Sequence, residues 1–307
     1  MISVVIPVYN EADSIKPLCF ELINVLKKIN ELFEIIFIND GSTDNSQAVI
    51  ESCQKNNPQI ISLKSRRNFG KATALQMGFS KAKGEVIVTM DGDLQDDPRE
   101  MEKLIAKLGQ GYDLVIGWKK NRQDSFFKKL SSKLFNWVVN LTFKLNLHDY
   151  NSGYKAFWAV TTRKIRFYGE LHRFIPVFIA NAGYKVTEVP VNHRPRKFGK
   201  SKYGPGRIFH GLFDLITVLF LTKYRYRPLH LFGYLGLTLF LFGIVGGSYL
   251  TWLKLAYHQA IGQRPLLLLS VLLIVIGVQI GLVGLLGELI VAIYIENDHE
   301  KLPKTHQ

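Results

Sequence analysis

Short apolar segments alternate with amphipathic segments over residues 1–117. The apolar segments are rich in β-branched residues and predict strands near 2–8, 34–39, 60–64, 85–90 and 112–117. Between them, apolar positions recur at helical spacing and predict helices near 13–29, 43–56, 70–82 and 98–109. This alternation is typical of an α/β domain, so we expect a mostly parallel sheet with helices on both faces.

The pattern continues less regularly in the middle of the chain. A longer helix is predicted over 126–145, and later strands are predicted over 154–158 and 185–191. Segment 207–222 has apolar residues at helical spacing beside basic residues. That combination is typical of a helix that lies in the plane of a membrane interface.

Two long apolar runs follow. Residues 229–253 include no Lys, Arg, Asp or Glu, and residues 265–295 are interrupted by Gln279 and Glu288. About twenty apolar residues cross the core of a bilayer, so these runs predict a two-helix transmembrane hairpin. We therefore expect an α/β domain over 1–204, a juxtamembrane amphipathic helix over 205–227, and the hairpin with a short tail over 228–307.

The net charge of +14 is concentrated in two clusters. The first contains Lys119, Lys120, Arg122, Lys128, Lys129 and Lys133. The second runs up to the first apolar run and contains Arg194, Arg196, Lys197, Lys200, Lys202, Arg207, Lys223, Arg225 and Arg227. The connection between the runs carries only Lys254 and Arg264. By the positive-inside rule, we expect the α/β domain and both termini to be cytoplasmic, in an integral protein of the cell (inner) membrane.

Other features narrow the class of protein. Because the basic residues flank the apolar runs and no nucleic-acid-reading motif is recognisable, we expect no nucleic-acid partner. Glycines spaced four residues apart in the runs suit helix packing, and the transmembrane region could support a homo-oligomer. The N-terminus lacks the features of a signal peptide. Cys19 and Cys53 fall in predicted helices and suit a reducing compartment.

The strand predicted at 85–90 runs into Asp91-Gly92-Asp93-Leu94-Gln95. Ligands of open α/β sheets bind beyond the carboxyl ends of the strands. Two carboxylates and an amide oxygen can hold one hard divalent cation and leave coordination positions for phosphates. An isolated Asp-x-Asp is more often a solvated turn, so the motif needs support from the rest of the chain.

Polar residues also follow the first two predicted strands. Asp40 could accept hydrogen bonds from a nucleotide base and Glu11 could hold a ribose. The alternative for Asp40-Gly41-Ser42 is a turn followed by a helix N-cap. No GxGxxG follows the first strand and no GxxxxGK[ST] occurs, which argues against a dinucleotide oxidoreductase and a P-loop NTPase. A metal would then handle the phosphates.

Several motifs together resemble one family. They are Ile6-Pro7-Val8-Tyr9-Asn10-Glu11, Asn39-Asp40-Gly41-Ser42-Thr43-Asp44, Arg67-Asn68-Phe69-Gly70-Lys71 and Asp91-Gly92-Asp93-Leu94-Gln95. Their order and spacing resemble family 2 glycosyltransferases with the GT-A fold. The segment 148–155, the pattern His193-x-x-Arg196-x-x-Gly199-x-Ser201-Lys202-Tyr203 and the hairpin are similar to polyprenyl-phosphate glycosyltransferases, the group of dolichyl-phosphate mannose synthase and bactoprenol glucosyltransferase. The Gln-x-x-Arg-Trp motif of processive synthases is absent.

The resemblance implies roles for individual residues. Nucleotide-sugar binding is implied for Pro7, Tyr9, Glu11, Asp40, Lys71, Asp91, Gly92, Asp93, Arg196, Ser201 and Lys202. A Mg²⁺ or Mn²⁺ cofactor is implied at Asp91, Asp93 and Gln95. Binding of the lipid phosphate is implied for Lys119, Arg122, Lys128, Lys129, Ser132 and Lys133. Catalytic roles are implied for Asp91, Asp93 and Asp149, the last read first as an orienting residue and second as a base.

We therefore expect inverting transfer of a hexose, glucose or mannose, from a UDP- or GDP-sugar to a polyprenyl phosphate (undecaprenyl or dolichyl phosphate) at the cytoplasmic membrane face. Such an acceptor is largely dianionic, because the second pKa of a phosphate monoester is about 6, and barely needs a base. One alternative is a lipid hydroxyl acceptor, which would need one. A second is a non-catalytic membrane scaffold, against which the intact Asp91, Asp93 and Gln95 argue. His172 is expected to be structural.

Overall fold

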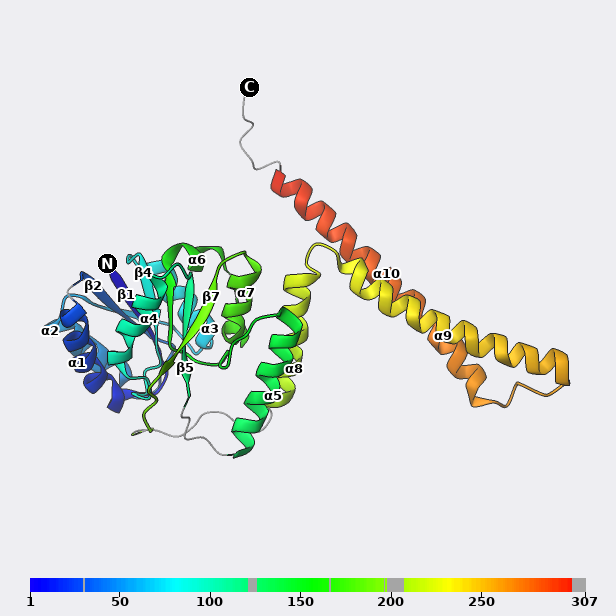
Figure 1. The fold of residues 1–307 in the computed structure, drawn as a ribbon, viewed down its shortest axis with the longest axis horizontal. Coiled ribbons are helices and arrows are strands. Elements are labelled where there is room, and N and C mark those ends of the chain that lie inside the picture. Colours follow the sequence, from blue (N-terminus) through cyan, green and yellow to red (C-terminus); the bar gives the residue numbers. More distant parts are fainter. Residues whose placement is uncertain (30, 121–125, 166, 196, 198–206, 300–307) are drawn as a thin grey trace, which may run out of the picture. The chain divides into compact units, whose positions relative to one another are not determined.

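The computed structural model describes residues 1–29, 31–120, 126–165, 167–195, 197 and 207–299 (Figure 1). The chain divides into two units, Met1–Leu215 and Ile216–Gln307, so that the division falls inside helix α8, Arg207–Lys223. The strands of the first unit are β1 Ile2–Val8, β2 Phe33–Asn39, β3 Ile60–Lys64, β4 Val86–Thr89, β5 Leu114–Lys119, β6 Lys155–Trp158 and β7 Val186–Val191. Its helices before α8 are α1 Ala12–Ile29, α2 Ser46–Asn56, α3 Lys71–Lys81, η1 Pro98–Glu100, α4 Met101–Leu108, α5 Phe126–Phe143, α6 Ala159–Lys164, η2 Leu171–Phe174 and α7 Ile175–Asn181.

The strands form one sheet in the order β3-β2-β1-β4-β6-β5-β7. β1 pairs in parallel with β2 and β4, β2 with β3, and β5 with β7, whereas β6 runs antiparallel to β4 and β5. The chain order changes direction at β1, which lies between β2 and β4. Such a switch point leaves a crevice beyond the carboxyl ends of the strands where ligands bind. The predicted mostly parallel sheet is confirmed.

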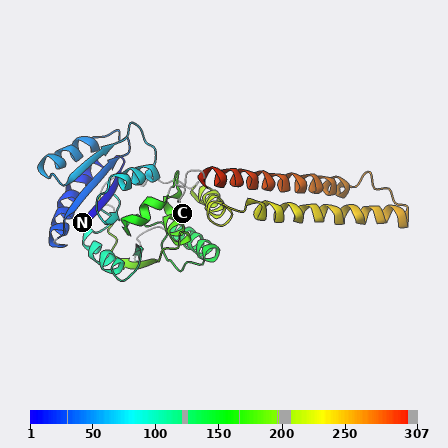
Figure 2. The same ribbon diagram turned by 90° about the horizontal axis from the view of Figure 1, so that it is seen from above.

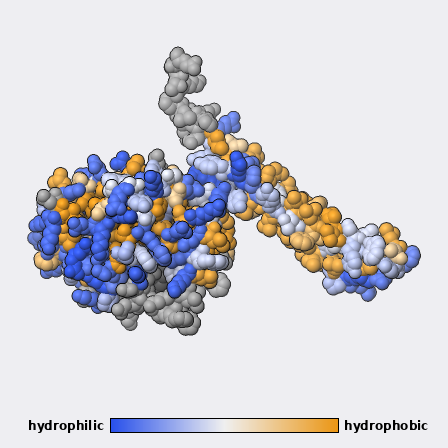
Figure 3. Space-filling model, in the orientation of Figure 1, coloured by the Kyte–Doolittle hydropathy of each residue, from blue (hydrophilic) through white to orange (hydrophobic). Residues whose placement is uncertain are grey.

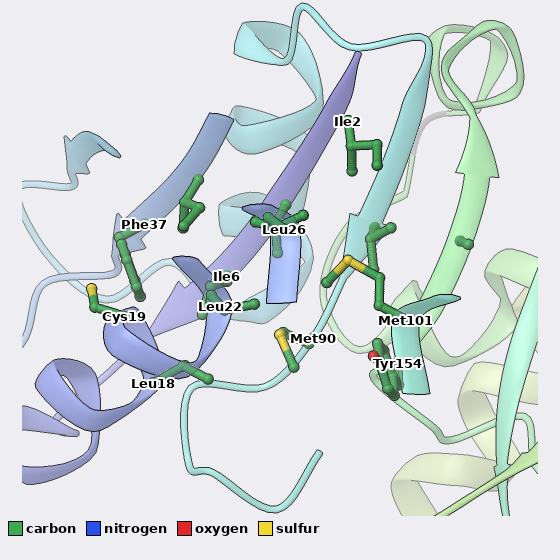
Figure 4. Close-up of a cluster of buried hydrophobic side chains, with 14 of the residues drawn as sticks. Ile2, Ile6, Leu18, Cys19, Leu22, Leu26, Phe37, Met90, Met101 and Tyr154 are labelled. Carbon is green, nitrogen blue, oxygen red and sulfur yellow. The ribbon is translucent and has the colours of Figure 1, made fainter. Parts of the chain in front are cut away.

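One face of the sheet carries the main hydrophobic core (Figure 4). Leu18, Leu22 and Leu26 of α1 pack toward Ile2 and Ile6 of β1, and every one of these side chains is almost fully buried. Full burial of one such side chain contributes about 1.5–3 kcal/mol. This layer fixes α1 and α4 against the strands and so holds the carboxyl edge of the sheet in place.

Aromatic contacts attach helices to the opposite face. Phe79 of α3 packs edge-on against Phe157 of β6, with ring centres 5.6 Å apart. Phe135 of α5 packs against Phe174 of η2 at 5.4 Å. Helices therefore cover both faces, as the alternating pattern predicted.

Element boundaries differ from the prediction where polar side chains organise the backbone. α2 begins at Ser46 instead of 43, because the carboxylate of Asp44 accepts hydrogen bonds from the N–H groups of Ser46 at 3.0 Å and Ala12 at 3.2 Å. The helix predicted at 98–109 is divided into η1 and α4, and the short helix α6 was not predicted. β5 begins and ends two residues later than predicted, since it pairs with β7 as far as Lys119.

The second unit contains the two apolar helices α9, Pro228–Tyr257, and α10, Pro265–His299, side by side (Figures 1 and 2). Both are long and apolar enough to cross a membrane, most of their side chains are exposed, and hydrophobic residues cover much of their surface (Figure 3). The backbones approach closely at Gly236, where an added Cβ would lie 2.6 Å from the Gly277 carbonyl oxygen. Glu288 accepts the N–H of Leu229 at 3.2 Å, which satisfies one of the unpaired groups at the start of α9.

Candidate active site

The segment after β4 is a structured turn. The Gly92 carbonyl accepts a hydrogen bond from Ser14 Oγ of α1 at 2.6 Å. Leu94 has a left-handed backbone with φ of 62°, which is uncommon for a residue other than glycine and persists only where the surroundings fix it. Asp93 is buried. A solvated Asp-Gly turn is therefore not what the chain forms here.

A buried ion pair supports this turn. Lys119 Nζ lies 2.7 Å from Asp96 Oδ1, and Asp96 Oδ2 accepts the N–H of Asp91 at 3.2 Å. Burial alone would lower the pKa of Lys119, but the carboxylates of Asp96 and Asp91 raise it above its ordinary value. The sequence grouped Lys119 with the basic residues expected to receive the lipid phosphate. The structure instead places the Lys119 ammonium inside the domain, where it pairs with Asp96. The Asp96 carboxylate in turn holds the turn after β4.

Lys71 forms an ion pair with Asp91. It is the first residue of α3, and its ammonium contacts Asp91 Oδ1. Burial raises the pKa of Asp91, but the ammonium groups of Lys71 and Lys119 outweigh this effect and hold the pKa well below its ordinary range. Asp91 is therefore ionised at physiological pH, which is the form that binds a cation.

Asp149 and Lys155 belong to the same charged cluster. Asp149 is buried, and its Oδ1 accepts the N–H of Asn151 at 3.1 Å in the turn that leads to β6. Lys155 is the first residue of β6, is also buried, and donates to the Ser152 carbonyl. Burial and the nearby Lys71 lower the pKa of Lys155 to about 7, against the opposing effects of Asp149 and Asp91.

Gly153 lies against the Asp91 carboxylate. A Cβ at Gly153 would lie 2.6 Å from Oδ1 and 2.7 Å from Oδ2 of Asp91, closer than side chains approach one another. Thr89 Oγ1 donates to the Gly153 carbonyl at 2.8 Å and fixes its position. Only glycine leaves room for the carboxylate here.

Sequence reasoning missed part of this cluster. Lys155 had a usable signal, because a lysine inside the apolar segment 154–158 needs a charged partner when the strand is buried. Asp96 directly follows the predicted motif. His172 on η2 gave no signal: it is buried, its Nδ1 has no hydrogen-bond partner among the described residues, and burial together with Lys71 holds its pKa well below the ordinary value.

The ends of β1 and β2 are joined by side-chain hydrogen bonds. The N–H of Asn10 donates to Ser42 Oγ at 3.0 Å. Asp40 is buried, and its two oxygens accept the N–H groups of Phe69 at 2.9 Å and Gly70 at 2.8 Å. Asp40 was predicted to bind the nucleotide. The structure shows that its carboxylate holds the loop that leads to α3.

Some of the remaining residues predicted to bind the nucleotide sugar lie in the described part of the chain, and others do not. Pro7, Tyr9 and Glu11 lie at the carboxyl end of β1 or just beyond it, and all three are partly exposed. Arg196, Ser201 and Lys202 lie outside the described residues. The roles of all six remain predictions.

The segment after β7 is tied to the metal motif. The N–H of Arg194 donates to the Gln95 carbonyl at 2.9 Å, and the Gln95 amide nitrogen donates to the Arg194 carbonyl at 3.5 Å. The Arg194 guanidinium pairs with Glu21 of α1 and with Asp97, each at 2.7 Å. This contact brings the start of the predicted His193–Tyr203 pattern to the turn after β4.

The basic residues predicted to bind the lipid phosphate are less completely described. Ser132 is partly exposed and Lys133 is exposed on α5. Arg122 and the side chains of Lys128 and Lys129 lie outside the described part of the chain. Their roles remain predictions.

The residues of the turn suit a hard divalent cation. Asp91 and Asp93 offer carboxylate oxygens and Gln95 offers an amide oxygen, the ligands that Mg²⁺ and Mn²⁺ prefer. No group of three or more His, Cys, Asp or Glu able to hold a metal ion occurs among the described residues. Three oxygen ligands from the turn would leave further coordination positions of such a cation for phosphates.

The fold and the site together are those of an open α/β domain with acidic and basic side chains at its switch-point edge, followed by two helices long and apolar enough to cross a membrane. The chain belongs to glycosyl transferase family 2, whose model matches residues 3–170. It is also 35% identical over 305 residues to the dodecaprenyl-phosphate galacturonate synthase of Rhizobium johnstonii, a similarity that covers 97% of this chain and 89% of that protein.

Solved structures share the fold. Glucosyl-3-phosphoglycerate synthase from Mycobacterium tuberculosis in complex with Mn²⁺, UDP and phosphoglyceric acid matches with a TM-score of 0.57 and 17% identity, over 71% of this chain and 78% of that chain. The same enzyme with Mg²⁺ and UDP matches with a TM-score of 0.57 and 18% identity, over 71% and 79% of the two chains. The predicted fold class is confirmed.

Proposed function

We propose that this protein transfers a sugar from a nucleotide sugar to a polyprenyl phosphate at a membrane surface. The main observation behind the proposal is the structured Asp91–Gln95 turn at the switch-point edge of the sheet, where Lys71 forms an ion pair with Asp91. A full-length relative named for a polyprenyl-phosphate product supports the acceptor. The two apolar helices supply the membrane anchor that such an acceptor requires.

The donor occupies the edge of β1, β2 and β4. Asp91, Asp93 and Gln95 would hold the Mg²⁺ or Mn²⁺, which neutralises charge that develops on the departing diphosphate. Lys71 would add positive charge beside the same diphosphate, because its ammonium already lies at Asp91. We keep the predicted contacts of Pro7, Tyr9, Glu11 and Asp40 with the nucleoside, and of Arg196, Ser201 and Lys202 with the diphosphate, as part of this proposal.

The acceptor supplies its own nucleophile. An oxygen of the phosphate attacks the anomeric carbon, and the bond from that carbon to the diphosphate oxygen breaks, so the nucleoside diphosphate leaves with the electron pair and the configuration inverts. A phosphate with a second pKa of about 6 is mostly dianionic at cytoplasmic pH. Asp149 therefore orients the reactants. Its hydrogen bond from Asn151 and its position beside Lys155 support this role.

The identity of the transferred sugar and of the donor's nucleobase is left to experiment. The sequence predicts glucose or mannose from a UDP- or GDP-sugar, whereas the relative is named for galacturonate. We propose that the active domain and both termini face the cytoplasm of the inner membrane and that the acceptor is undecaprenyl or dolichyl phosphate.

The test is transfer by the full-length protein in detergent or vesicles. Labelled UDP-glucose, UDP-galacturonate and GDP-mannose are each supplied with polyprenyl phosphate and Mg²⁺ or Mn²⁺, and the lipid product is measured. We expect one donor to give product, chelation to stop transfer, and Asp91→Asn to lower the rate by about 10²-fold or more with an unchanged thermal midpoint. Full activity of Asp91→Asn in excess chelator would contradict the metal assignment, and no transfer from any donor would contradict the function.

A further inference from the structure

An exposed histidine is held in one orientation beside Asp149. The His148 ring stacks on Trp118 of β5, with ring centres 4.2 Å apart and planes 16° from parallel. Its Nδ1 contacts one carboxylate oxygen of Glu188 on β7, and the His148 backbone N–H donates to the other at 2.7 Å. The side chain of His148 is nevertheless 64% exposed, whereas that of Glu188 is 11% exposed.

These contacts determine which ring nitrogen can meet a ligand. A carboxylate only accepts hydrogen bonds, so Glu188 places the proton of the contact on Nδ1 of His148. Nε2 is then the nitrogen that remains for a ligand, and the stacking on Trp118 keeps the ring from turning. An ordered and exposed imidazole loses little further rotamer freedom when it binds, which favours a role in recognition.

The position of His148 separates it from the nucleotide. Trp118 and Glu188 belong to β5 and β7, at the opposite end of the strand order from β2 and β3. Neighbouring strands lie about 4.8 Å apart, so β5 is about 14 Å and β7 about 19 Å from β1. A nucleoside at the ends of β1 and β2 does not reach this edge. On the proposed function, the acceptor is the second substrate, and this edge is assigned to it.

Two lysines lie on or next to the elements that contact His148. Lys120 Nζ lies 5.8 Å from the centre of the Trp118 ring. Asn136 of α5 donates to the His148 carbonyl, and Lys133 precedes Asn136 by three residues, which places both on one side of that helix. Lys120 and Lys133 therefore lie at the end of β5 and on α5, the elements that contact His148, and their positive charge suits an anionic ligand.

We propose that His148, as an imidazolium with a proton on both ring nitrogens, is a binding residue for the terminal phosphate of the acceptor: Nδ1–H donates to Glu188, which positions the ring, and Nε2–H donates to a phosphate oxygen. This assignment rests on the proposed function. It adds to the basic residues predicted from the sequence an imidazole that is fixed before the lipid arrives. A charge-assisted hydrogen bond to a phosphate is directional and does not form with an uncharged polyprenol.

The experiment uses full-length protein in detergent, and it measures binding of polyprenyl phosphate and of polyprenol as well as transfer. His148→Asn keeps an amide nitrogen where Nδ1 contacts Glu188 and removes Nε2. We expect it to weaken phosphate binding, and to raise the KM for the phosphate, by about tenfold or more. Polyprenol binding, the donor KM and the thermal midpoint should stay at wild-type values. Glu188→Gln should weaken phosphate binding in the same direction.

The control is His258→Asn, the same change at an exposed histidine after α9. Phosphate binding by His148→Asn within about twofold of wild type, or an equal loss of polyprenol binding, would overturn the assignment. If binding depends on His148 but no donor gives transfer, the proposed function fails and the phosphate site stands. If His148→Asn transfers sugar with a wild-type acceptor KM, the proposed function stands and the assignment fails.

Discussion

Charged side chains around the turn after β4 largely compensate one another. Three lysines face four carboxylates, and the members of this group are Lys71, Lys119, Lys155, Asp91, Asp93, Asp96 and Asp149. For Asp91 and Lys119, nearby opposite charges offset the free-energy cost of burial, whereas burial and Lys71 still lower the pKa of Lys155 to about 7. Removal of one member therefore affects the protonation and the position of the others.

Gly153 offers the most direct test of how closely this group is positioned. In Gly153→Ala, the new methyl group would overlap the Asp91 carboxylate, which must then move. A misplacement of about 1 Å can lower a rate by about 10²-fold, so we expect a loss of that size in kcat with an almost unchanged thermal midpoint. Initial rates at saturating substrates measure it.

The matched control is Gly109→Ala at the end of α4. There an added Cβ would lie 3.5 Å from its nearest neighbour, at ordinary contact distance, and the φ of −62° suits alanine. Wild-type turnover by Gly153→Ala would mean that the Asp91 carboxylate does not need its present position.

The residues of the site that follow strands could be predicted, because the carboxyl ends of parallel strands meet at one edge. Asp91 follows β4 and does lie there. Lys71 begins α3 and Asp149 precedes β6, so their meeting with Asp91 did not follow from the strand ends. The placement of Lys119 could not be predicted from composition. Neighbouring residues in a strand point to opposite faces, so Trp118 and Lys119 separate, and which one faces inward depends on the register of β5 with β7.

At the scale of elements, Arg194 connects parts that are distant in the chain. It joins Glu21 of α1 to Asp97 at the start of η1 and follows β7. Burial raises the pKa of Asp97, but Arg99 and Arg194 outweigh this and lower it from 3.8 to about 2. A carboxyl group with a depressed pKa stabilises the fold above its unfolded pKa, and this contribution is lost as the pH falls through the folded pKa.

We expect Arg194→Met to lower the free energy of unfolding by about 2 kcal/mol at neutral pH, because Asp97 keeps a buried charge without this partner. The difference from wild type should narrow as the pH falls below about 4 and should vanish only well below pH 2, because Asp97 is still half ionised in the folded state at its pKa of about 2. Thermal unfolding of the full-length protein across this range measures the effect.

Arg99→Met is the control, since Arg99 pairs with the same carboxylate but its side chain is 74% exposed. Exposed ion pairs contribute about 0–1 kcal/mol, so its effect should be clearly smaller. If the free energy of unfolding of Arg194→Met were lowered equally at every pH, Arg194 would stabilise the fold by packing and not by pairing with the charge of Asp97.

The types and order of the elements followed from the hydrophobic periodicity, whereas their ends did not. α2 starts later than predicted because the Asp44 carboxylate accepts a hydrogen bond from the N–H of Ser46. Such a side-chain hydrogen bond competes with helical backbone bonds, and hydrophobic periodicity does not reveal it. The bond between Arg194 and Gln95 joins segments about a hundred residues apart, so only the folded sheet could reveal it.

At the scale of the whole molecule, the orientation in the membrane is the main expectation to test. Gln259 is exposed in the connection between α9 and α10, and Lys185 is exposed before β7. We expect Gln259→Cys to react with a membrane-impermeant maleimide in intact cells, and Lys185→Cys to react only after permeabilisation. Labelling of both from outside, or the reverse order, would contradict a cytoplasmic catalytic domain.

The wild-type chain provides a low background for this measurement. Cys19 and Cys53 are its only cysteines, and both are buried and unbridged. Burial and a contact with Cys53 raise the pKa of Cys19 far above its ordinary value, so little of it is present as the reactive thiolate.

The excess of carboxylates over lysines at the turn after β4 has a consequence for competition inside a cell. Cytoplasm contains abundant inorganic phosphate and many phosphorylated metabolites, each able to occupy a site that simply attracts anions. An empty turn with slightly more negative than positive charge repels them. On the proposed function, the nucleotide sugar overcomes this repulsion because it arrives with a divalent cation. We therefore expect free phosphate to compete only weakly with the nucleotide sugar.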